Sequence, residues 1–275
     1  VPRFIIFKVS GTITWNSYVD LNAVNSFVTV AGQTAPGDGI AIKGYPLRMS
    51  NTDAFHDGIF MNLRFRIGTG SSLPIRDLKC ITILGGTYNV VIDHCSLTWD
   101  SDQAFTQRED VHDITWSWNI NAEGADPTHN TGGLFGNGTP HVDITVHHNF
   151  LAHRNFRNYK ATSGRIQFIN NVNYNTFNWD YQFSQQQNTG TDSVKYDLIG
   201  NYFKEGPNKI TRKAPFNMLR EVAGTYKPMS LYVINNASVD INSNGITYSD
   251  GIDPSGQWNL VGIRVFQGMT PNYEV

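Results

Sequence analysis

Charged side chains are scarce in this chain of 275 residues, at 16% of the sequence against about a quarter in an average globular protein. The formal net charge is −2, so there is no excess of basic residues to attract nucleic acid. The sequence also lacks a run of about 18 consecutive apolar residues, the length that a helix needs to span a bilayer. The composition therefore predicts neither a nucleic-acid partner nor membrane insertion.

Cysteine is almost absent, and the apolar periodicity of amphipathic helices is missing as well. The two cysteines, Cys80 and Cys95, permit one disulfide at most and lack the spacing of a metal site. The chain instead contains 25 glycines, and asparagine makes up about one residue in ten. Both residue types favour turns over helices, so we expect a chain built almost wholly of β-strands and turns.

Short stretches of alternating apolar and polar residues, separated by turns rich in Gly, Asn and Asp, indicate the strands. The candidate strands are Phe4–Val9, Phe27–Ala31, Ile59–Phe65, Cys80–Leu84, Val90–Leu97, Ile114–Ile120, Val142–Phe150, Ile166–Val172, Tyr196–Phe203 and Leu231–Ile234. The opening residues already read as a strand and lack the features of a secretion signal. We therefore expect the natural protein to have a further N-terminal portion.

An asparagine recurs near the end of successive strands. Asn119, Asn149, Asn171, Asn201 and Asn235 are separated by 30, 22, 30 and 34 residues, and a repeat of about 20 to 35 residues is typical of a solenoid. Strands of a parallel β-helix stack about 4.8 Å apart, so equivalent asparagines can form hydrogen bonds from coil to coil. A β-sandwich also gives frequent short strands, but it leaves this repeat unexplained.

The sequence thus predicts a single all-β domain, residues 1–275, folded as a parallel β-helix. Two long polar segments, Asn121–Pro140 and Asn178–Asp192, are expected to be loops that project from one face and form the wall of a binding site. Three aromatic residues in the second segment, Trp179, Tyr181 and Phe183, could stack either on sugar rings or inside the solenoid.

Three stretches of the sequence resemble the pectate lyase family of single-chain polysaccharide lyases. They are AGQTAPGDGI at 31–40, VVIDHCSLTW at 90–99, and the segment 143–171. The resemblance runs from about Val9 to Asn175. It implies a right-handed parallel β-helix, an extracellular location, and cleavage of an acidic, uronate-containing polysaccharide by β-elimination.

The residue that the resemblance identifies as catalytic is Arg157. In the family, a strand ending in His-Asn is followed at fixed distances by an arginine and a glycine, which fall here at Arg157 and Gly164 when counted from His148. The resemblance implies that this arginine is the base that removes the C5 proton of the uronate. The chain departs from the pattern where Tyr159 replaces a proline and Lys160 replaces a second arginine.

Basic residues of the same region are expected to bind the acidic substrate. These are Lys160, Arg154 and His129, the last in a segment where the family has a lysine. Positive charge matters here for a second reason. The pKa of arginine exceeds about 12, so Arg157 can act as a base only where neighbouring cations disfavour its charged form.

The calcium site that the resemblance implies has lost two of its three acidic ligands. Of the family's three acidic positions, the first is Cys80, the third is Thr106, and only the second, Asp102, keeps its carboxylate. Asp100 and Glu109 are close enough in sequence to compensate, but Ca²⁺ takes about six to eight oxygen ligands. We expect weak calcium binding at most, so any lyase activity would have to take its positive charge from side chains.

A function of a different class fits the same residues. A β-helix without catalytic activity could bind a glycan or form a structural subunit of an extracellular or virion-surface assembly. Neighbouring histidines suggest a zinc site, but His147 and His148 are expected on opposite faces of a strand, which argues against a shared ion. The sequence leaves the oligomeric state and the particular polysaccharide open.

Overall fold

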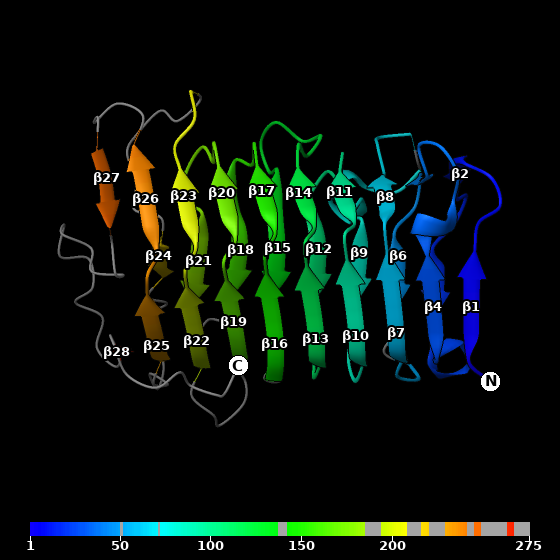
Figure 1. The fold of residues 1–275 in the computed structure, drawn as a ribbon, viewed down its shortest axis with the longest axis horizontal. Helices are drawn as coiled ribbons and strands as arrows, with labels where there is room; N and C mark the ends of the chain where they lie inside the picture. The colour runs from blue at the N-terminus through cyan, green and yellow to red at the C-terminus, as the bar shows by residue number, and fades with distance from the viewer. Residues whose placement is uncertain are drawn as a thin grey trace.

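The computed structural model describes residues 1–49, 52–70, 72–136, 142–184, 194–207, 216–219, 229–240, 245–248 and 263–266. In these residues, short strands follow one another along a helical path and stack into three sheets (Figure 1). The helical elements of the same residues are the 3₁₀ turns η1 (Ala23–Asn25), η2 (Gly32–Thr34) and η3 (Ile75–Asp77). No described helix has the length and apolar character required to cross a membrane.

Each sheet takes one strand from nearly every coil. In spatial order, sheet A consists of β1 (Arg3–Ile6), β4 (Val28–Ala31), β7 (His56–Met61), β10 (Tyr88–Asp93), β13 (His112–Ser117), β16 (Val142–His147), β19 (Arg165–Ile169), β22 (Val194–Ile199), β25 (Met229–Ile234) and β28 (Ile263–Phe266). Sheet B consists of β2 (Gly11–Thr14), β5 (Ile40–Lys43), β8 (Leu63–Arg66), β11 (Ser96–Thr98), β14 (Ile120–Ala122), β17 (Phe150–Ala152), β20 (Val172–Tyr174), β23 (Tyr202–Lys204), β26 (Ala237–Asp240) and β27 (Gly245–Tyr248). Sheet C consists of β3 (Val19–Leu21), β6 (Leu47–Met49), β9 (Ile81–Ile83), β12 (Gln103–Gln107), β15 (Thr131–Phe135), β18 (Phe156–Ala161), β21 (Tyr181–Ser184) and β24 (Phe216–Leu219).

Neighbouring strands in these sheets are parallel, apart from the antiparallel pair β26 and β27. Because a strand of one coil pairs with its counterpart in the next coil, the partners in the parallel pairs are 22 to 35 residues apart, as for Ile144 with Ile166 and Tyr196 with Leu231. The arrangement confirms the predicted right-handed parallel β-helix.

The corner between sheets A and B divides stretches that the sequence analysis predicted as single strands. Val90–Leu97 is broken at His94, and Val142–Phe150 is broken at His148, into β10 and β11 and into β16 and β17. The two histidines have φ values of +50° and +56°, in the left-handed region. A residue in that conformation turns the chain and ends the strand, and apolar periodicity alone does not reveal it.

Directly after each corner residue, a buried asparagine forms one rung of a ladder along the solenoid. The rungs are Asn119, Asn149, Asn171, Asn201 and Asn236. From Asn149 onward, each side-chain Oδ1 accepts a hydrogen bond from the backbone N–H of the preceding rung, at 2.9 to 3.1 Å. Each Nδ2 donates to a backbone carbonyl of the preceding coil. The predicted ladder is confirmed.

The two ends of the ladder differ from the prediction. The fifth rung is Asn236, because Asn235 takes the corner position with φ +57° and is exposed. At the other end, Cys95 occupies the rung before Asn119, and its backbone N–H donates to Asn119 Oδ1 at 2.8 Å. The Cys95 Sγ lies 3.6 Å from the Phe60 carbonyl, the place that an asparagine Nδ2 takes in later coils. Cys95 and Cys80 are free, buried thiols.

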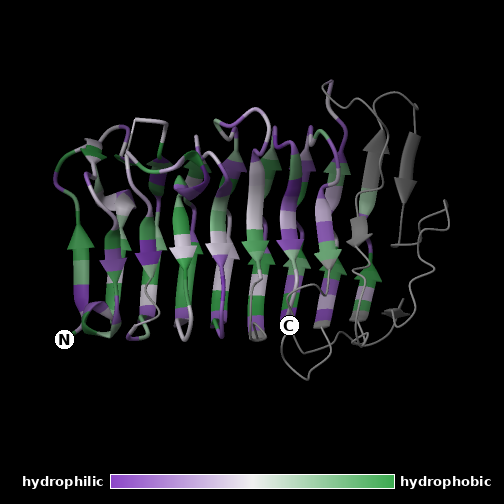
Figure 2. Cartoon of the chain, turned by 180° about the vertical axis from the view of Figure 1, so that it is seen from behind, coloured by the Kyte–Doolittle hydropathy of each residue, from purple (hydrophilic) through white to green (hydrophobic). Residues whose placement is uncertain are grey.

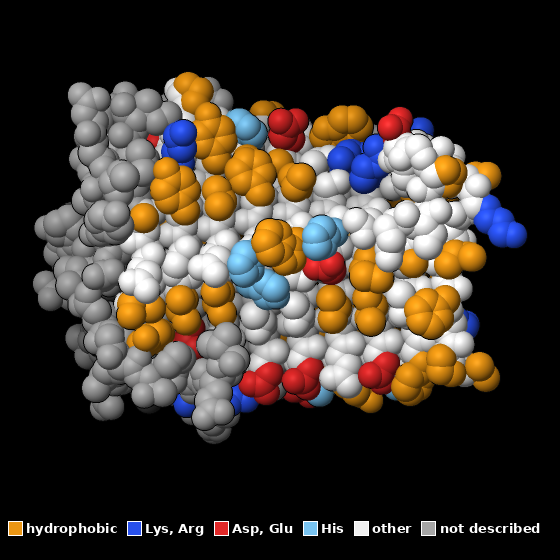
Figure 3. Space-filling view, in the orientation of Figure 1, with side chains coloured by type: hydrophobic (Ala, Val, Ile, Leu, Met, Phe, Trp, Pro, Cys, Tyr) orange, Lys and Arg blue, Asp and Glu red, His pale blue; other side chains and the backbone are white. Residues whose placement is uncertain are grey.

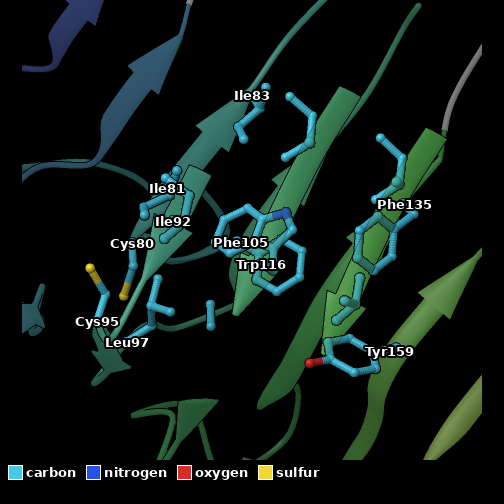
Figure 4. Close-up of a cluster of buried hydrophobic side chains, with 14 of the residues drawn as sticks. Cys80, Ile81, Ile83, Ile92, Cys95, Leu97, Phe105, Trp116, Phe135 and Tyr159 are labelled. Carbon is cyan, nitrogen blue, oxygen red and sulfur yellow. The ribbon is translucent and has the colours of Figure 1, made fainter. Parts of the chain in front are cut away.

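The interior of the solenoid is a continuous apolar core with a column of aromatic rings. Figure 4 shows Phe105 and Trp116 packed face to face, with ring centroids 4.0 Å apart, and Phe135 and Tyr159 beyond them. Strand residues alternate between this core and the surface, which Figure 2 shows as alternating green and purple bands. Tyr181 and Phe183 belong to the same core, with no exposed surface, so they do not stack on sugar.

Parts of the two segments predicted as loops are strands of sheet C. Strand β15 lies within Asn121–Pro140, and β21 lies within Asn178–Asp192. Both contribute buried aromatic residues, Phe135 and Tyr181, to the core. The prediction was wrong for these residues because polar neighbours obscured their period-2 pattern. The remaining residues of the second segment from 185 onward lie outside the described part of the chain.

We expect Asn149→Ala to reduce the free energy of unfolding by about 1–3 kcal/mol for each buried partner left unsatisfied. The partners include the Asn119 backbone N–H and the Trp116 carbonyl. Denaturant unfolding, followed by circular dichroism, would measure the change. Gln33→Ala, at an exposed position, is the control and should alter stability little. Equal stability of the two variants would contradict the structural role of the ladder.

Candidate active site

Strand β18 carries the residues that the sequence analysis placed at the centre of the site. Its Tyr159 is buried in the core, beside Phe105 of β12 and Tyr181 of the adjacent strand β21. Since side chains alternate along a strand, the next residue, Lys160, lies on the outer face, in register with Leu134 on β15. The core aromatic residues thus fix which face Lys160 occupies.

A β-bulge on β18 orients Arg157. The pairing of β15 with β18 shifts register between Thr131 and Gly133, and Arg157 has a φ of +57°. Such bulges redirect a side chain. The guanidinium is held by a hydrogen bond from Nε to Gln182 Oε1 at 2.6 Å, and its Cζ lies 4.6 Å from the centre of the Phe156 ring.

Arg157 opens onto a small cavity on the outer face of sheet C. The residues that line the cavity are Gln103, Arg108, Thr131, Gly133, Leu134, Arg157 and Lys160. Three of them are cationic, and no carboxylate is among them. Partial burial lowers the pKa of Arg157, although the charge of Asp102 opposes this shift. The cavity is therefore suited to bind an anion beside Arg157.

Asp102 lies beside this cavity and is surrounded by donors. Its Oδ2 is 2.9 Å from Lys79 Nζ, and its Oδ1 is 2.8 Å from His129 Nδ1. Gln103 also donates to Oδ1, from Nε2 at 2.9 Å. Burial alone would raise the pKa of Asp102, but the hydrogen bonds and positive charges of His129 and Lys79 hold it below its usual value. The carboxylate is therefore anionic and fully engaged with side chains.

The calcium ion that the resemblance implies does not fit these residues. Both oxygens of Asp102 face donor groups, and one of those groups is the Lys79 ammonium. Cys80 is buried with its Sγ 3.7 Å from the Thr98 carbonyl, and the Thr106 hydroxyl donates to Gln103. Within the described residues, no group of three or more His, Cys, Asp or Glu side chains could hold a metal ion. A hard cation needs free oxygen ligands, and this site offers none from Asp102.

Arg154 does not belong to the substrate-binding face, which corrects the sequence analysis. Its side chain has no exposed surface and forms an ion pair with Asp100, with Nη1 2.8 Å from Oδ2. Further hydrogen bonds connect it to Asn121 and Asn130. The guanidinium thus ties together three coils from inside the solenoid and cannot contact a polysaccharide.

Residues that the sequence analysis did not identify complete the site. Arg108 follows the end of β12, Gln182 lies on β21, and Lys79 directly precedes Cys80. The sequence contained a clue to Lys79, since this basic residue directly precedes Cys80, one of the expected calcium-ligand positions. For Gln182 and Arg108 there was no such signal, because their places depend on the register of sheet C.

The histidines at the corner of sheets A and B are arranged differently from the prediction. His147 and His148 were expected on opposite faces, but their Nδ1 atoms lie 2.9 Å apart, because His148 occupies the left-handed corner position. The ring of His148 stacks on Trp118, with centroids 4.5 Å apart. Figure 3 shows histidines gathered at mid-face around an exposed apolar side chain. This cluster lies on a different face from the cavity of sheet C.

The fold and the site together define a parallel β-helix with a cationic cavity on one sheet. No family profile matches the chain. The probable pectate lyase C of Aspergillus flavus is 33% identical over 206 residues, which are 75% of this chain and 45% of that protein. The probable pectate lyase C of Aspergillus fumigatus is 32% identical over 206 residues, with the same coverage of 75% and 45%.

A solved structure gives the same result for the fold. The structure of the thermostable pectate lyase PL 47 aligns with a TM-score of 0.64 and 18% sequence identity, covering 94% of this chain and 65% of that one. The resemblance to the pectate lyase family is confirmed, and the chain is a relative of the pectate lyases in sequence and in fold. It spans less than half the length of the curated relatives it matches, at 45%.

Arg154→Met is expected to reduce the free energy of unfolding by about 3–5 kcal/mol, because it leaves Asp100 buried without its partner. Lys160→Met removes a charge of the same sign on the outer face and should reduce the free energy of unfolding by no more than about 1 kcal/mol. Adding Asp100→Asn to Arg154→Met should recover part of the loss. Denaturant unfolding tests all three proteins, and a mild effect of Arg154→Met would contradict its structural role.

Proposed function

We propose that this chain carries the active site of a lyase that cleaves an acidic polysaccharide by β-elimination at a uronate residue. The observation that carries the proposal is the cavity on sheet C, where Arg108, Arg157 and Lys160 meet without a carboxylate on the lining. The similarity to proteins named pectate lyase supports the same class of substrate. An extracellular location agrees with such a substrate and stays a prediction.

The proposed reaction needs a base next to a cationic binding site. Arg157 removes the proton from C5 of the uronate, and the electron pair of that C–H bond forms a C4–C5 double bond in the sugar. The C4–O bond breaks, and the oxygen keeps that bond's electrons and becomes a hydroxyl group at the end of the second fragment. The C5 proton is weakly acidic, so positive charge near the uronate carboxylate must stabilise the enediolate that develops. Lys160 and Arg108 are the cavity residues that supply this charge.

Orientation of the base comes from its neighbours. Gln182 accepts the hydrogen bond of Arg157 Nε and the Phe156 ring lies under the guanidinium, so two neighbours fix its orientation at the cavity. Arg157 is half-buried beside the cavity, whereas Arg154 is buried in the interior. Positioning of this kind contributes to catalysis because the reacting groups are held in a productive geometry.

Binding without catalysis is the second candidate function. It is favoured by the same engagement of Asp102 that leaves calcium without ligands, since the positive charge that assists elimination must then come from side chains alone. The two candidates share the cavity and the acidic glycan, and differ only in whether Arg157 removes a proton.

Arg157→Ala is expected to reduce the elimination rate by about 10²–10⁴-fold, the usual contribution of a general base. Arg157→Lys should restore little, because the guanidinium geometry positions the base. The assay incubates the protein with polygalacturonate, alginate or ulvan and follows the ultraviolet absorption of the new double bond, which is conjugated with a carboxylate. Arg165→Ala, on β19 and paired with Asp143, is the control and should keep full activity. A wild-type rate in Arg157→Ala would refute the assignment.

Activity is expected to be the same with and without a calcium chelator, because the positive charge at the site comes from Lys160 and Arg108. Calorimetric titration of the protein with Ca²⁺ should give no saturable binding in the micromolar range, since the oxygens of Asp102 are engaged by Lys79, His129 and Gln103. Micromolar binding that disappears in Asp102→Asn would contradict this prediction.

A further inference from the structure

Three basic side chains meet on the outer face of sheet B, a different sheet from the one that carries the cavity. Arg64 and Arg66 lie on β8 on either side of the buried Phe65, so both are on the outer face. Lys43 is the last residue of β5 and follows Ile42, which pairs with Phe65, so Lys43 lies opposite Arg66. In the described residues, none of the three members of this basic cluster forms an ion pair with a carboxylate.

The basic cluster is unfavourable for the protein alone, because like charges opposite one another on neighbouring strands repel. Burial lowers the pKa of Arg66, and the charge of Arg64 adds to that shift, while Glu123 opposes it without pairing with Arg66. Arg66 is held in place all the same, since its Nη1 donates to the Phe65 and Ser96 carbonyls at 2.9 and 3.2 Å. A fixed group of cations without a paired carboxylate is suited to bind an anion from outside the protein.

The same face becomes apolar toward the later coils. The outward positions that pair with one another along this row are Arg64, Ser96, Ile120, Phe150, Val172 and Tyr202. Ile120, Phe150 and Val172 are exposed, and Figure 3 shows apolar side chains gathered over β14, β17 and β20. Single exposed apolar residues are ordinary, but a contiguous patch of them marks an interaction surface.

The charged side chains of these strands are all cations. Strands β5, β8, β11, β14, β17, β20 and β23 of sheet B contain no Asp or Glu. Lys204 of β23 lies opposite Tyr174 of β20, with its Nζ 6.0 Å from the centre of the tyrosine ring. Cations therefore flank the apolar patch on both sides, with the basic cluster at one end and Lys204 at the other.

Charge and apolar surface together select the ligand. An acidic polysaccharide carries carboxylates along its length, and the C–H groups of its sugar rings pack on aromatic and aliphatic side chains. The coils repeat at about 4.8 Å, which is close to the length of one sugar residue, so successive sugars can meet successive strands. A neutral apolar partner would leave the cations unmatched, whereas a uronate chain complements both the cations and the patch.

We propose that the outer face of sheet B, from Lys43 to Lys204, is a second binding site for an acidic polysaccharide. The choice of a uronate polymer as this ligand rests on the proposed function. The basic cluster binds its carboxylates, and its sugar rings lie on Phe150 and the neighbouring apolar residues. No chemistry takes place there. A polymer held on sheet B meets the cavity of sheet C as an intramolecular partner, which raises its effective concentration at Arg157.

Binding is tested in Arg157→Ala, the variant expected not to cleave the polymer, by calorimetric titration with polygalacturonate, alginate or ulvan. A second linked site strengthens binding by about 10²–10⁴-fold, so adding Arg64→Gln with Arg66→Gln should raise the Kd at least tenfold. Adding Phe150→Ala instead should raise it as well. Added salt should weaken binding less steeply in the Arg64 and Arg66 double variant, because exposed charge contacts are screened.

The matched controls lie on sheet A. Arg165→Gln on β19 removes an outward cation, and Ile59→Ala on β7 removes an apolar side chain that is 37% exposed, against 39% for Phe150. Neither should change the Kd. With Arg157 intact, the sheet B variants should raise KM for the polymer without changing kcat, and they should match the wild type on a uronate trimer, which occupies the cavity alone.

The outcomes separate the two proposals. Polymer affinities of the sheet B variants equal to those of the controls would overturn the second site and leave Arg157 as the base. A dimeric wild type that becomes monomeric in these variants, with polymer affinity unchanged, would also overturn it and make the face an interface between two copies. Polymer binding that depends on sheet B, in a wild-type protein that cleaves no uronate polymer, would refute the proposed function alone. Absence of binding to every uronate polymer would overturn both.

Discussion

The hydrogen bond from one coil to the next is the interaction on which this structure depends. Strands of adjacent coils pair through their backbones, but backbone pairing alone does not fix where each coil turns. The asparagine ladder does so, because each buried side chain bonds the corner of one coil to the backbone of its neighbour. Unsatisfied buried amides would cost about 1–3 kcal/mol each, so coils that slipped in register would be strongly disfavoured.

Fixed corners determine what each sheet presents to solvent. With the turns aligned, side chains in equivalent positions form rows, and the aromatic column of Phe105, Tyr159 and Tyr181 fills the interior. Lys160 then has to lie on the outer face of sheet C, since Tyr159, its neighbour in the strand, is buried. The site departs from this regularity at a single bulge, and that bulge gives Arg157 its direction.

The electrostatics of the site follow from which charges are paired and which face the cavity. Arg154 and Asp100 neutralise one another inside the solenoid, and Lys79 with His129 engages Asp102 at its edge. The charged residues that line the cavity are all cations. Side chains thus provide the positive field that an ion would provide in a site rich in carboxylates, and they do so without the free oxygen ligands that Ca²⁺ requires.

The sequence by itself determined the fold class, because the asparagine repeat and the strand periodicity are local patterns that recur once per coil. It also identified Arg157, Lys160, His129 and Asp102 as residues of one region. Only the tertiary structure decided that Arg154, three residues before Arg157, is buried, since its partner Asp100 is 54 positions away. The partners of Asp102 were decided in the same way, because they come from different coils. The register between coils is set by contacts between them and not by neighbouring residues in the chain.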